Sequence, residues 1–370
     1  MSLVVESIKS SASENLHLQI SLYSLLRTLR LEVDMTIFLA IVLLLSAVAE
    51  CAPQLGIMAM GGSTWKKVSS TSVQPVYRQD AKREIVRYGP LELYAKSVSI
   101  RLRSNGKFIH KIQARKGTGA IIAMDPNGQA GVITINEGIC KKCSIMSARF
   151  SLTYENGTEA SPATGVYIHH FVSYDAVKSD RDPLVGCHGG FYGMGAPFLD
   201  RGEDSGHTDT VYTPRAGMKG VESGYHMDSG SLIVQYDMVN YAEVTKNIYL
   251  NLEYEYKNNQ DDKDVSNSLK SVTCNGVIPP KVSQSGPAVT TSIPMLVTRA
   301  TTIIWARGHL HAGGVKMDLN VNGKTVCTSK PTYNSNGVIT DMSLCPDLIP
   351  LTAGSYVTIS SEYDLTKHPL

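Results

Sequence analysis

Short stretches of alternating apolar and polar residues recur along this chain, and few stretches keep a helical repeat beyond three turns. An alternation with a period of two places every second side chain on one face, as in a half-buried strand. The stretches that fit this pattern are 93–102, 165–172, 231–236, 246–256, 301–306, 315–321 and 355–363. The pattern therefore predicts an all-β fold.

Turn-forming sequences separate these stretches. They include 126–128, Asn156-Gly157, Asn322-Gly323 and Asn336-Gly337. Tight hairpins favour such pairs because both residues tolerate a positive φ. Short strands joined by regular turns are typical of sandwiches and jelly rolls, and not of a parallel α/β sheet. We expect two jelly-roll-like β-sandwich domains after an N-terminal signal segment.

A polar break divides the chain, which at 370 residues is long for a single domain. Residues 257–287 combine a run of Asn, Gln and Asp with three prolines, as linkers do. We expect a first sandwich domain at 65–258, a linker or irregular lead into the next domain at 259–285, and a second sandwich domain at 286–370. We expect this second domain to be C-terminally truncated.

An apolar run of about 13 residues follows Met35 and ends in small residues at Ala47 and Ala49. That length suits a signal-peptide core with an A-x-A cleavage site, and it falls short of the roughly 20 residues of a spanning helix. We expect a signal peptide at 35–52 and a secreted protein with no stable membrane span after cleavage. Residues 1–34 are then an extension or a long n-region. The alternative is a chain anchored in a membrane through 36–49.

Seven cysteines fit an oxidising compartment. Cys51 lies beside the expected cleavage site, which leaves six cysteines for up to three disulfides: Cys140, Cys143, Cys187, Cys274, Cys327 and Cys345. A zinc site is the alternative for Cys140 and Cys143, although no second C-x-x-C follows. Asn156-Gly-Thr158 is an N-glycosylation sequon, so we expect an exported glycoprotein.

The charges exclude some functions. The chain has 35 basic and 33 acidic residues and no long run of either sign, so it lacks the concentrated basic face that nucleic acid requires. No serine lies in a G-x-S-x-G turn, so the sequence offers no candidate nucleophile for a hydrolase triad of that kind. The expected partner is a small-molecule or peptide substrate.

Two histidine pairs are the strongest candidates for chemistry. On a strand, His309 and His311 would point to one face, about 6.6 Å apart along the chain, and could bind one metal ion. His169 and His170 are adjacent, so they can share an ion only where a bulge or a strand end turns one of them. The structural alternatives are solvated histidines for the first pair, and one core and one exposed histidine for the second. Because the pairs fall in different predicted domains, their distribution favours metal binding.

The segments around these pairs carry a resemblance. They are Tyr167-Ile-His-His-Phe171, Gly308-His-Leu-His-Ala-Gly-Gly314 and Glu362-Tyr-Asp-Leu-Thr-Lys-His-Pro369. They resemble the copper type II, ascorbate-dependent monooxygenases that hydroxylate peptidylglycine or dopamine. They are also similar to a set of secreted fungal proteins and to the stress-upregulated nodulin-like proteins of plants. The resemblance covers about residues 85–370 loosely, and only the two histidine motifs are specific.

The resemblance implies two mononuclear copper sites and ascorbate as reductant. His169 and His170 would hold the copper that relays an electron. His309 and His311 would hold the copper that activates dioxygen, and Arg307 would contact a substrate carboxylate. The product would be a hydroxylated C–H bond. No catalytic acid or base is assigned.

The chain departs from that family in two ways. The third histidine of the first site is expected near 232–241, where Tyr236 and Asp237 stand. His226 and His207 are loose candidates for this role. The methionine ligand of the second site is expected beyond Leu370, whereas Met342 is expected in the core.

Two functions follow from these observations. The first is a secreted copper-binding protein that is monooxygenase-like if active, and the position of Arg307 before His309 favours it. The alternative is a non-catalytic secreted β-sandwich protein that acts at the cell wall, in stress response or at a host surface. The missing third histidine favours this alternative.

Overall fold

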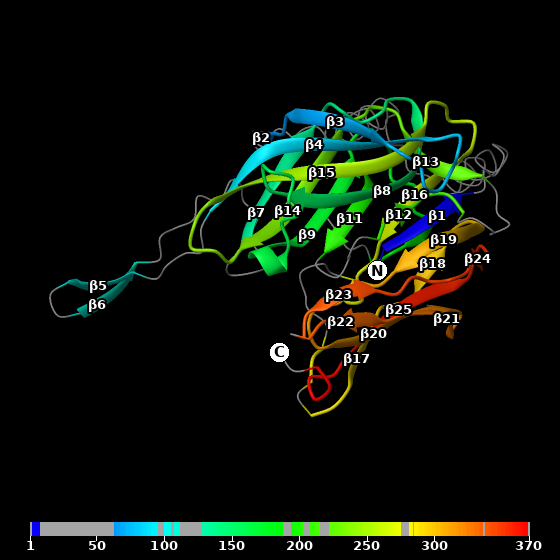
Figure 1. Cartoon of the computed structure of the whole chain (residues 1–370). Coiled ribbons are helices and arrows are strands. Elements are labelled where there is room, and N and C mark those ends of the chain that lie inside the picture. The colour runs from blue at the N-terminus through cyan, green and yellow to red at the C-terminus, as the bar shows by residue number, and fades with distance from the viewer. Residues whose placement is uncertain are drawn as a thin grey trace, which may run out of the picture. The chain divides into compact units, whose positions relative to one another are not determined.

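The computed structural model describes residues 2–7, 63–94, 100–104, 107–111, 128–187, 194–202, 208–214, 222–274, 281–283, 285–335 and 337–368. Throughout these residues the regular structure is strand, apart from the short 3-10 turn η1 at Pro162–Thr164, which confirms the predicted all-β fold (Figure 1). The predicted signal peptide at 35–52, the extension from residue 8 onward and the candidate His207 lie outside the described residues. Nowhere in the described part is there a helix that is long and apolar enough to cross a membrane.

The largest sheet has the strand order β24-β19-β1-β16-β13-β8-β15-β4-β3, with β12 also paired to β8. Its strands are β24 Ile349–Leu351, β19 Thr301–Arg307, β1 Ser2–Ser7, β16 Lys263–Leu269, β13 Ser223–Met227, β8 Cys143–Thr153, β15 Lys246–Lys257, β4 Lys82–Leu93, β3 Lys67–Val73 and β12 Thr210–Val211. Neighbouring strands are antiparallel, except that β13 and β16 are parallel.

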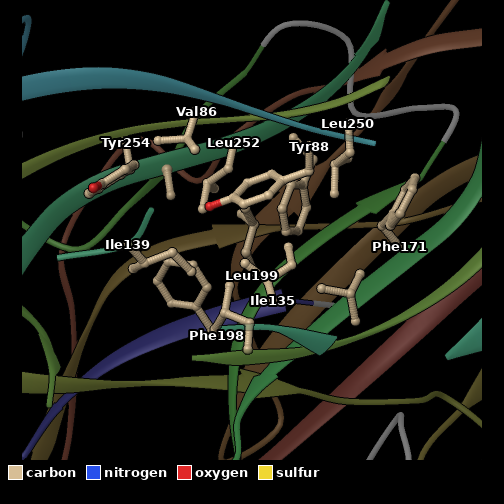
Figure 2. Close-up of a cluster of buried hydrophobic side chains, with 14 of the residues drawn as sticks. Val86, Tyr88, Ile135, Ile139, Phe171, Phe198, Leu199, Leu250, Leu252 and Tyr254 are labelled. Atoms are coloured by element: carbon tan, nitrogen blue, oxygen red, sulfur yellow. The ribbon is translucent and has the colours of Figure 1, made fainter. Parts of the chain in front are cut away.

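A second sheet has the order β11-β9-β14-β7-β2. Its strands are β11 Ala196–Gly202, β9 Val166–Asp175, β14 Leu232–Asn240, β7 Gly128–Ile135 and β2 Ser63–Thr64. The first hydrophobic core draws its side chains from both sheets (Figure 2). Phe150 of β8 meets Phe171 of β9 with ring centroids 5.7 Å apart, for example. This is the packing of a β-sandwich, in which the inner faces of two sheets share one core.

A third sheet has the order β10-β18-β25-β20-β21, with β17 paired to β25. Its strands are β10 Leu184–Val185, β18 Met295–Val297, β25 Tyr356–Tyr363, β20 Gly314–Val321, β21 Lys324–Ser329 and β17 Ala288–Thr291. The inner residues of this sheet, such as Met295, Leu319 and Ile359, form a second core. Two separate hairpins complete the described structure: β22 Pro331–Tyr333 with β23 Ile339–Met342, and β5 Ile100–Ser104 with β6 Lys107–Lys111.

Six of the seven predicted strands are confirmed, as β9, β14, β15, β19, β20 and β25. The stretch 93–102 is not one strand, because Leu93 ends β4, Ile100 begins β5, and 95–99 lie outside the described residues. The alternation missed β8, whose residues from Cys143 to Ala148 are all buried. A strand that is buried on both sides shows no alternation.

Strand β19 contributes to both cores. Ile304 and Trp305 belong to the first core, and Ile303 and Ala306 belong to the second. The stretch 259–285, expected as a linker, contains β16, which lies between β1 and β13 in the largest sheet. The domain boundaries drawn from the sequence therefore remain predictions.

The six predicted cysteines form three disulfides: Cys140–Cys143, Cys187–Cys274 and Cys327–Cys345. The alternative of a zinc site at Cys140 and Cys143 does not hold, because zinc requires thiolates and both sulfur atoms are in a disulfide. Asn156, the residue of the sequon, is exposed on the turn between β8 and β9.

Candidate metal centre

A β-bulge in β9 sets the position of the first histidine pair. In the pairing of β14 with β9, Asp237 lies opposite His170 and Met238 lies opposite Ile168, so His169 is the extra residue. A regular strand would point adjacent side chains to opposite faces. Here the centroids of the His169 and His170 rings are 4.2 Å apart. The bulge therefore meets the condition under which adjacent histidines can share an ion.

The second pair follows a strand and does not lie on one. β19 ends at Arg307, and His309 and His311 lie in the connection to β20. Leu310 between them is 3% exposed and packs in the second core. The two histidines flank this buried side chain, and their ring centroids are 5.0 Å apart. The predicted alternation of His309, Leu310 and His311 thus holds without the predicted strand.

Close backbone packing explains where the strand ends. A Cβ atom at Gly308 would lie 3.0 Å from the Met342 methyl group and 3.1 Å from Ser329 Oγ, tighter than side chains normally pack. The backbone N–H of Gly308 donates to Ser329 Oγ at 3.0 Å, and that of His309 approaches Met317 Sδ at 3.4 Å. The connection that carries the histidines is therefore held against the second core.

The two histidine pairs meet. His170 Nε2 and His309 Nε2 are 3.0 Å apart, and the His311 ring centroid is 5.2 Å from that of His169 and 5.3 Å from that of His170. One ring nitrogen from each of His169, His170 and His311 lies within 4.8 Å of the others. We call His169, His170, His309 and His311 the histidine cluster. The resemblance implied two separate sites, whereas the described structure brings both pairs into one place.

The spacing within the cluster fits a metal ion. Two imidazole nitrogens bound to one ion through bonds of about 2.0–2.1 Å lie about 2.9–3.4 Å apart for angles between about 90° and 110°. One ring nitrogen from each of His169, His170 and His311 lies within 4.8 Å of the others, so small side-chain shifts would bring them to this spacing. His170 Nδ1 is buried with no hydrogen-bond partner among the described residues. Such an orphaned buried atom is what a missing ligand would leave.

The cluster keeps the His170 ring in the form that binds metals. Burial lowers the pKa of His170 well below its ordinary value, and the three neighbouring histidine rings lower it further. A low pKa means a neutral imidazole at physiological pH, and only the neutral ring has a lone pair for a metal.

Asp237 orients the first pair. Its Oδ2 is 3.0 Å from His169 Nδ1, and its side chain is 8% exposed. A carboxylate that accepts the Nδ1 proton fixes the tautomer of a metal-binding histidine, so the metal binds through Nε2. The resemblance pointed to this stretch for a third histidine ligand, and the structure has there a carboxylate that contacts His169. An isolated aspartate in the apolar strand β14 was the sequence signal for it.

A cavity of about 60 Å³ opens beside the cluster. It is lined by His169, His309, Leu310, His311, Ala312, Val338 and Ile339. The last two residues come from the β22–β23 hairpin, whose second strand begins at Ile339. A small molecule in this cavity would therefore touch histidines on one side and aliphatic side chains on the other.

The other candidates from the sequence lie elsewhere. Arg307 is 4% exposed at the end of β19, with its guanidinium carbon 5.6 Å from the centroid of the Trp305 ring, and it is not among the residues that line the cavity. Its contact with a substrate carboxylate stays a prediction. Met342 is 1% exposed in the second core, as expected.

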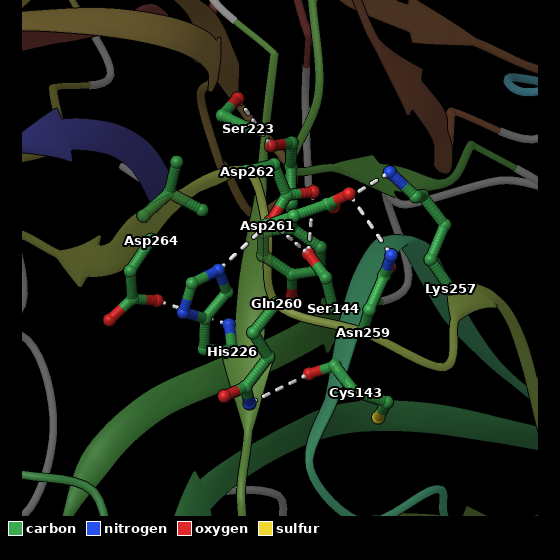
Figure 3. Close-up of polar contacts among 12 residues, drawn as sticks. Cys143, Ser144, Ser223, His226, Lys257, Asn259, Gln260, Asp261, Asp262 and Asp264 are labelled. Atoms are coloured by element: carbon green, nitrogen blue, oxygen red, sulfur yellow. Dashed lines mark hydrogen bonds and ion pairs between the residues drawn. The ribbon is translucent and has the colours of Figure 1, made fainter.

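His226 belongs to a different polar network (Figure 3). Its Nε2 is 2.9 Å from Asp262 Oδ1, and the same carboxylate accepts a hydrogen bond from Ser144 Oγ. The backbone N–H of His226 donates to Asp264. The network connects β13, β8 and the start of β16, so His226 has a structural partner and lies apart from the histidine cluster.

The fold and this cluster define an all-β protein with a polyhistidine site suited to a transition metal. No family model matches the chain. It is 22% identical over 247 residues to a protein of Phoma sp. named "Probable copper-dependent oxygenase M1", a match that covers 62% of this chain and 59% of that protein. It is 23% identical over 236 residues to "Probable copper-dependent oxygenase clz3" of Cochliobolus lunatus, covering 59% of this chain and 70% of that protein. The match thus spans less than two thirds of the Phoma protein's own length.

Proposed function

We propose that this chain is a copper-binding, oxygenase-like protein whose histidine cluster holds one copper ion. The observation that carries the proposal is the convergence of two histidine pairs from β9 and the β19–β20 connection. Imidazole is a ligand that suits copper, and copper(II) binds such sites more tightly than the other divalent metals of its row. The names of the two fungal relatives support the choice of copper.

One centre, and not two, is the proposed arrangement. His169, His170 and His311 are the proposed ligands, since their nitrogens lie closest to a common point. His309 lies against His170 and completes the cluster. Two copper ions side by side in the cluster are the alternative arrangement, and metal analysis distinguishes it from one ion.

The proposed reaction is hydroxylation of a C–H bond with dioxygen. One oxygen atom enters the substrate as a hydroxyl group, and the other leaves as water. The balance requires two electrons and two protons, which ascorbate supplies as it is oxidised to dehydroascorbate. Bound copper would supply dioxygen binding and one-electron chemistry.

The residues of the chain prepare that chemistry. Asp237 holds the His169 ring in one orientation, and burial keeps His170 neutral. The cavity beside His309 and His311 gives a substrate access to the cluster. The aliphatic wall of the cavity limits the water beside the reacting bond.

We also propose that the protein is exported. Three disulfides support an oxidising compartment, and the exposed Asn156 is available for glycosylation. A chain anchored through 36–49 is the alternative form.

A non-catalytic copper-binding protein is the second candidate. The observation that favours it is the burial of Arg307, because the residue implied as the substrate anchor does not line the cavity. This protein would bind copper equally well but would not couple ascorbate oxidation to hydroxylation.

Metal analysis of the purified full-length protein tests the proposal. We expect one copper per chain, with the electron paramagnetic resonance signal of nitrogen ligands. His169→Ala, His170→Ala and His311→Ala should each abolish that same copper. His226→Ala is the matched control and should keep it, since His226 pairs with Asp262 outside the cluster.

Two results would count against the proposal. A wild-type protein that binds no copper would refute the copper function. Two coppers that are lost independently, one with His169→Ala and one with His311→Ala, would refute the single centre. Ascorbate-dependent oxygen consumption by the copper-loaded protein separates the enzyme from the non-catalytic candidate.

A further inference from the structure

We propose that the cavity beside the histidine cluster accepts an uncharged alkyl group, and that Val338 and Ile339 select it. The proposal rests on the proposed function, because it names the substrate class of the same site. Leu310, Ala312, Val338 and Ile339 line the cavity together with three histidines. Among the described residues, none of those that line it is Asp, Glu, Lys or Arg.

Without the metal, this lining discriminates by charge. A charged group that enters the metal-free cavity loses its hydration and finds no Asp, Glu, Lys or Arg in the lining, so its binding is unfavourable. An alkyl group gains from the same transfer because it leaves water for an apolar surface. The metal-free cavity should therefore prefer the neutral member of any pair of molecules of equal shape.

The position of Arg307 supports the same conclusion. Its side chain is 4% exposed and lies by the Trp305 ring, and Trp305 belongs to the first core. Arg307 is not among the residues that line the cavity, so its side chain offers no positive charge to a carboxylate there. The resemblance implies that Arg307 binds a substrate carboxylate. In this chain Arg307 does not reach the cavity beside the histidine cluster.

The aliphatic wall is held in a fixed place relative to the histidines. The backbone N–H of Val338 donates to Asn334 Oδ1 at 3.0 Å, and that of Asn334 donates to Val338 O at 2.9 Å. Tyr333 at the end of β22 donates its hydroxyl proton to Gly314 O at 2.7 Å. The His368 ring stacks on the Tyr333 ring with centroids 4.0 Å apart.

These contacts tie the β22–β23 hairpin to the turn that follows His311. The Cys327–Cys345 disulfide closes the segment that contains the hairpin. Because backbone contacts, Tyr333 and the disulfide hold the wall, its side chains can change without loss of its position. Val338 and Ile339 are therefore specificity-determining residues for a substrate at the cluster.

A matched pair of probes tests the proposal. Isopropyl methyl sulfone and isopropylsulfonate have nearly the same shape, but only the second carries a charge, and neither is a strong copper ligand. Saturation-transfer NMR on the metal-free protein measures the binding of each probe, because the charge of bound copper(II) would itself attract the sulfonate. We expect the sulfone to bind at least tenfold more tightly than the sulfonate. Metal analysis of the copper-loaded protein tests the copper function separately.

Variants of Val338 and Ile339 test whether these two residues cause the preference for the neutral probe. Val338→Asp should weaken sulfone binding at least tenfold, because it puts a carboxylate into the aliphatic lining. Ile339→Ala should shift the preference toward a bulkier neutral probe, tert-butyl methyl sulfone. Val289→Asp is the control, since Val289 is 56% exposed on β17 and does not line the cavity. Circular dichroism checks that each variant is folded.

The outcomes separate this proposal from the proposed function. In the metal-free protein, equal or stronger binding of the sulfonate would overturn the proposal and leave the copper function standing. Binding of neither probe, or sulfone binding that Val338→Asp does not change, would also overturn it. If no copper binds, the copper function fails, and saturation-transfer NMR on the metal-free protein still compares the two probes at the same wall.

Discussion

Asp237 shows how one residue outside the proposed ligands could control the site. Its carboxylate accepts a hydrogen bond from His169 Nδ1, so the ring presents Nε2 to the cluster. The residue lies opposite the bulge in β9 that contains His169. The same stretch of β14 thus sets both the direction of the His169 ring and its tautomer.

Asp237→Asn should lower copper affinity about 10–100-fold. An amide can donate a proton to Nδ1, which would move the ring proton to Nε2 and block the lone pair that binds the metal. Competition with a chelator of known affinity measures the loss. Asp262→Asn is the matched control, because Asp262 also pairs with a half-buried histidine, His226, at 2.9 Å. Equal copper affinity for Asp237→Asn and wild type would contradict the assigned role.

The two histidine pairs could be predicted from sequence as candidate metal ligands. The contact between the two pairs could not. The spacing of His309 and His311 indicates that both rings share a direction, and the adjacent pair indicates that a bulge is needed. The 3.0 Å contact between His170 and His309 joins residues 139 positions apart. It depends on how two sheets pack, and no local pattern contains that information. The sequence therefore identified the two pairs separately, and only the structure shows that they lie together; the two copper sites that the resemblance implied stay a prediction.

The Cys327–Cys345 disulfide encloses the β22–β23 hairpin and should stabilise the fold. Cys327 and Cys345 are 18 residues apart and enclose the hairpin that forms the cavity wall. Closing a loop of this size lowers the entropy of the unfolded chain, a stabilisation of about 3 kcal/mol. The double variant Cys327→Ser, Cys345→Ser should lose about this amount in urea unfolding.

Cys140 and Cys143 provide the comparison for this prediction. They are 3 residues apart, so the corresponding double variant should lose only about 1.5 kcal/mol. If the two double variants lose the same stability, loop entropy is not the origin of the effect.

Three strands of the largest sheet share a half-buried carboxylate, Glu253, whose ionisation should make stability depend on pH. Glu253 of β15 lies 2.9 Å from Arg83 of β4 and 2.5 Å from Arg149 of β8. Burial alone would raise the pKa of Glu253, but the hydrogen bonds and charges of the two arginines outweigh burial and lower it. A carboxyl group whose pKa is lower in the folded state stabilises the fold above its unfolded pKa of about 4.3.

This contribution should be constant at neutral pH and should disappear as the pH falls from about 5 through the pKa of the folded state. Urea midpoints measured between pH 7 and pH 3 should fall more steeply for wild type than for Glu253→Gln. The variant removes the titrating group and retains the shape, so it isolates this residue from other carboxyls. Parallel pH profiles for the two proteins would show that Glu253 does not contribute.

Alternation predicts strands that have one face in a core and the other near water. It succeeds for β25, where every second residue from Val357 to Tyr363 is buried. It fails for β16, where Ser266, Asn267 and Ser268 are all buried. Asn267 donates a hydrogen bond to Phe198 O, and Ser268 donates one to Asp182. These tertiary hydrogen bonds allow polar side chains of the stretch predicted as a linker to be buried in a strand.

At the scale of the whole molecule, the histidine cluster joins the two hydrophobic cores. His169 and His170 belong to β9, which packs in the first core through Ile168 and Phe171. His309 and His311 flank Leu310 of the second core. β19 leads into this connection and contributes side chains to both cores. A metal ion at the cluster would therefore bind residues from both cores at once.

Copper should stabilise both cores together. A ligand that binds only the folded state adds about 2.7 kcal/mol when its free concentration is 100 times its Kd. Because the ligands come from both cores, opening either core should release the ion. Hydrogen exchange of the most protected amides in β8 and β25 should slow by the same factor when copper is added, and a chelator should reverse the effect. His311→Ala should remove the effect from both strands, whereas His226→Ala should leave it. Protection that copper changes in β8 and not in β25 would mean that the first pair binds the ion without the second, and the single cluster would then not be the working site.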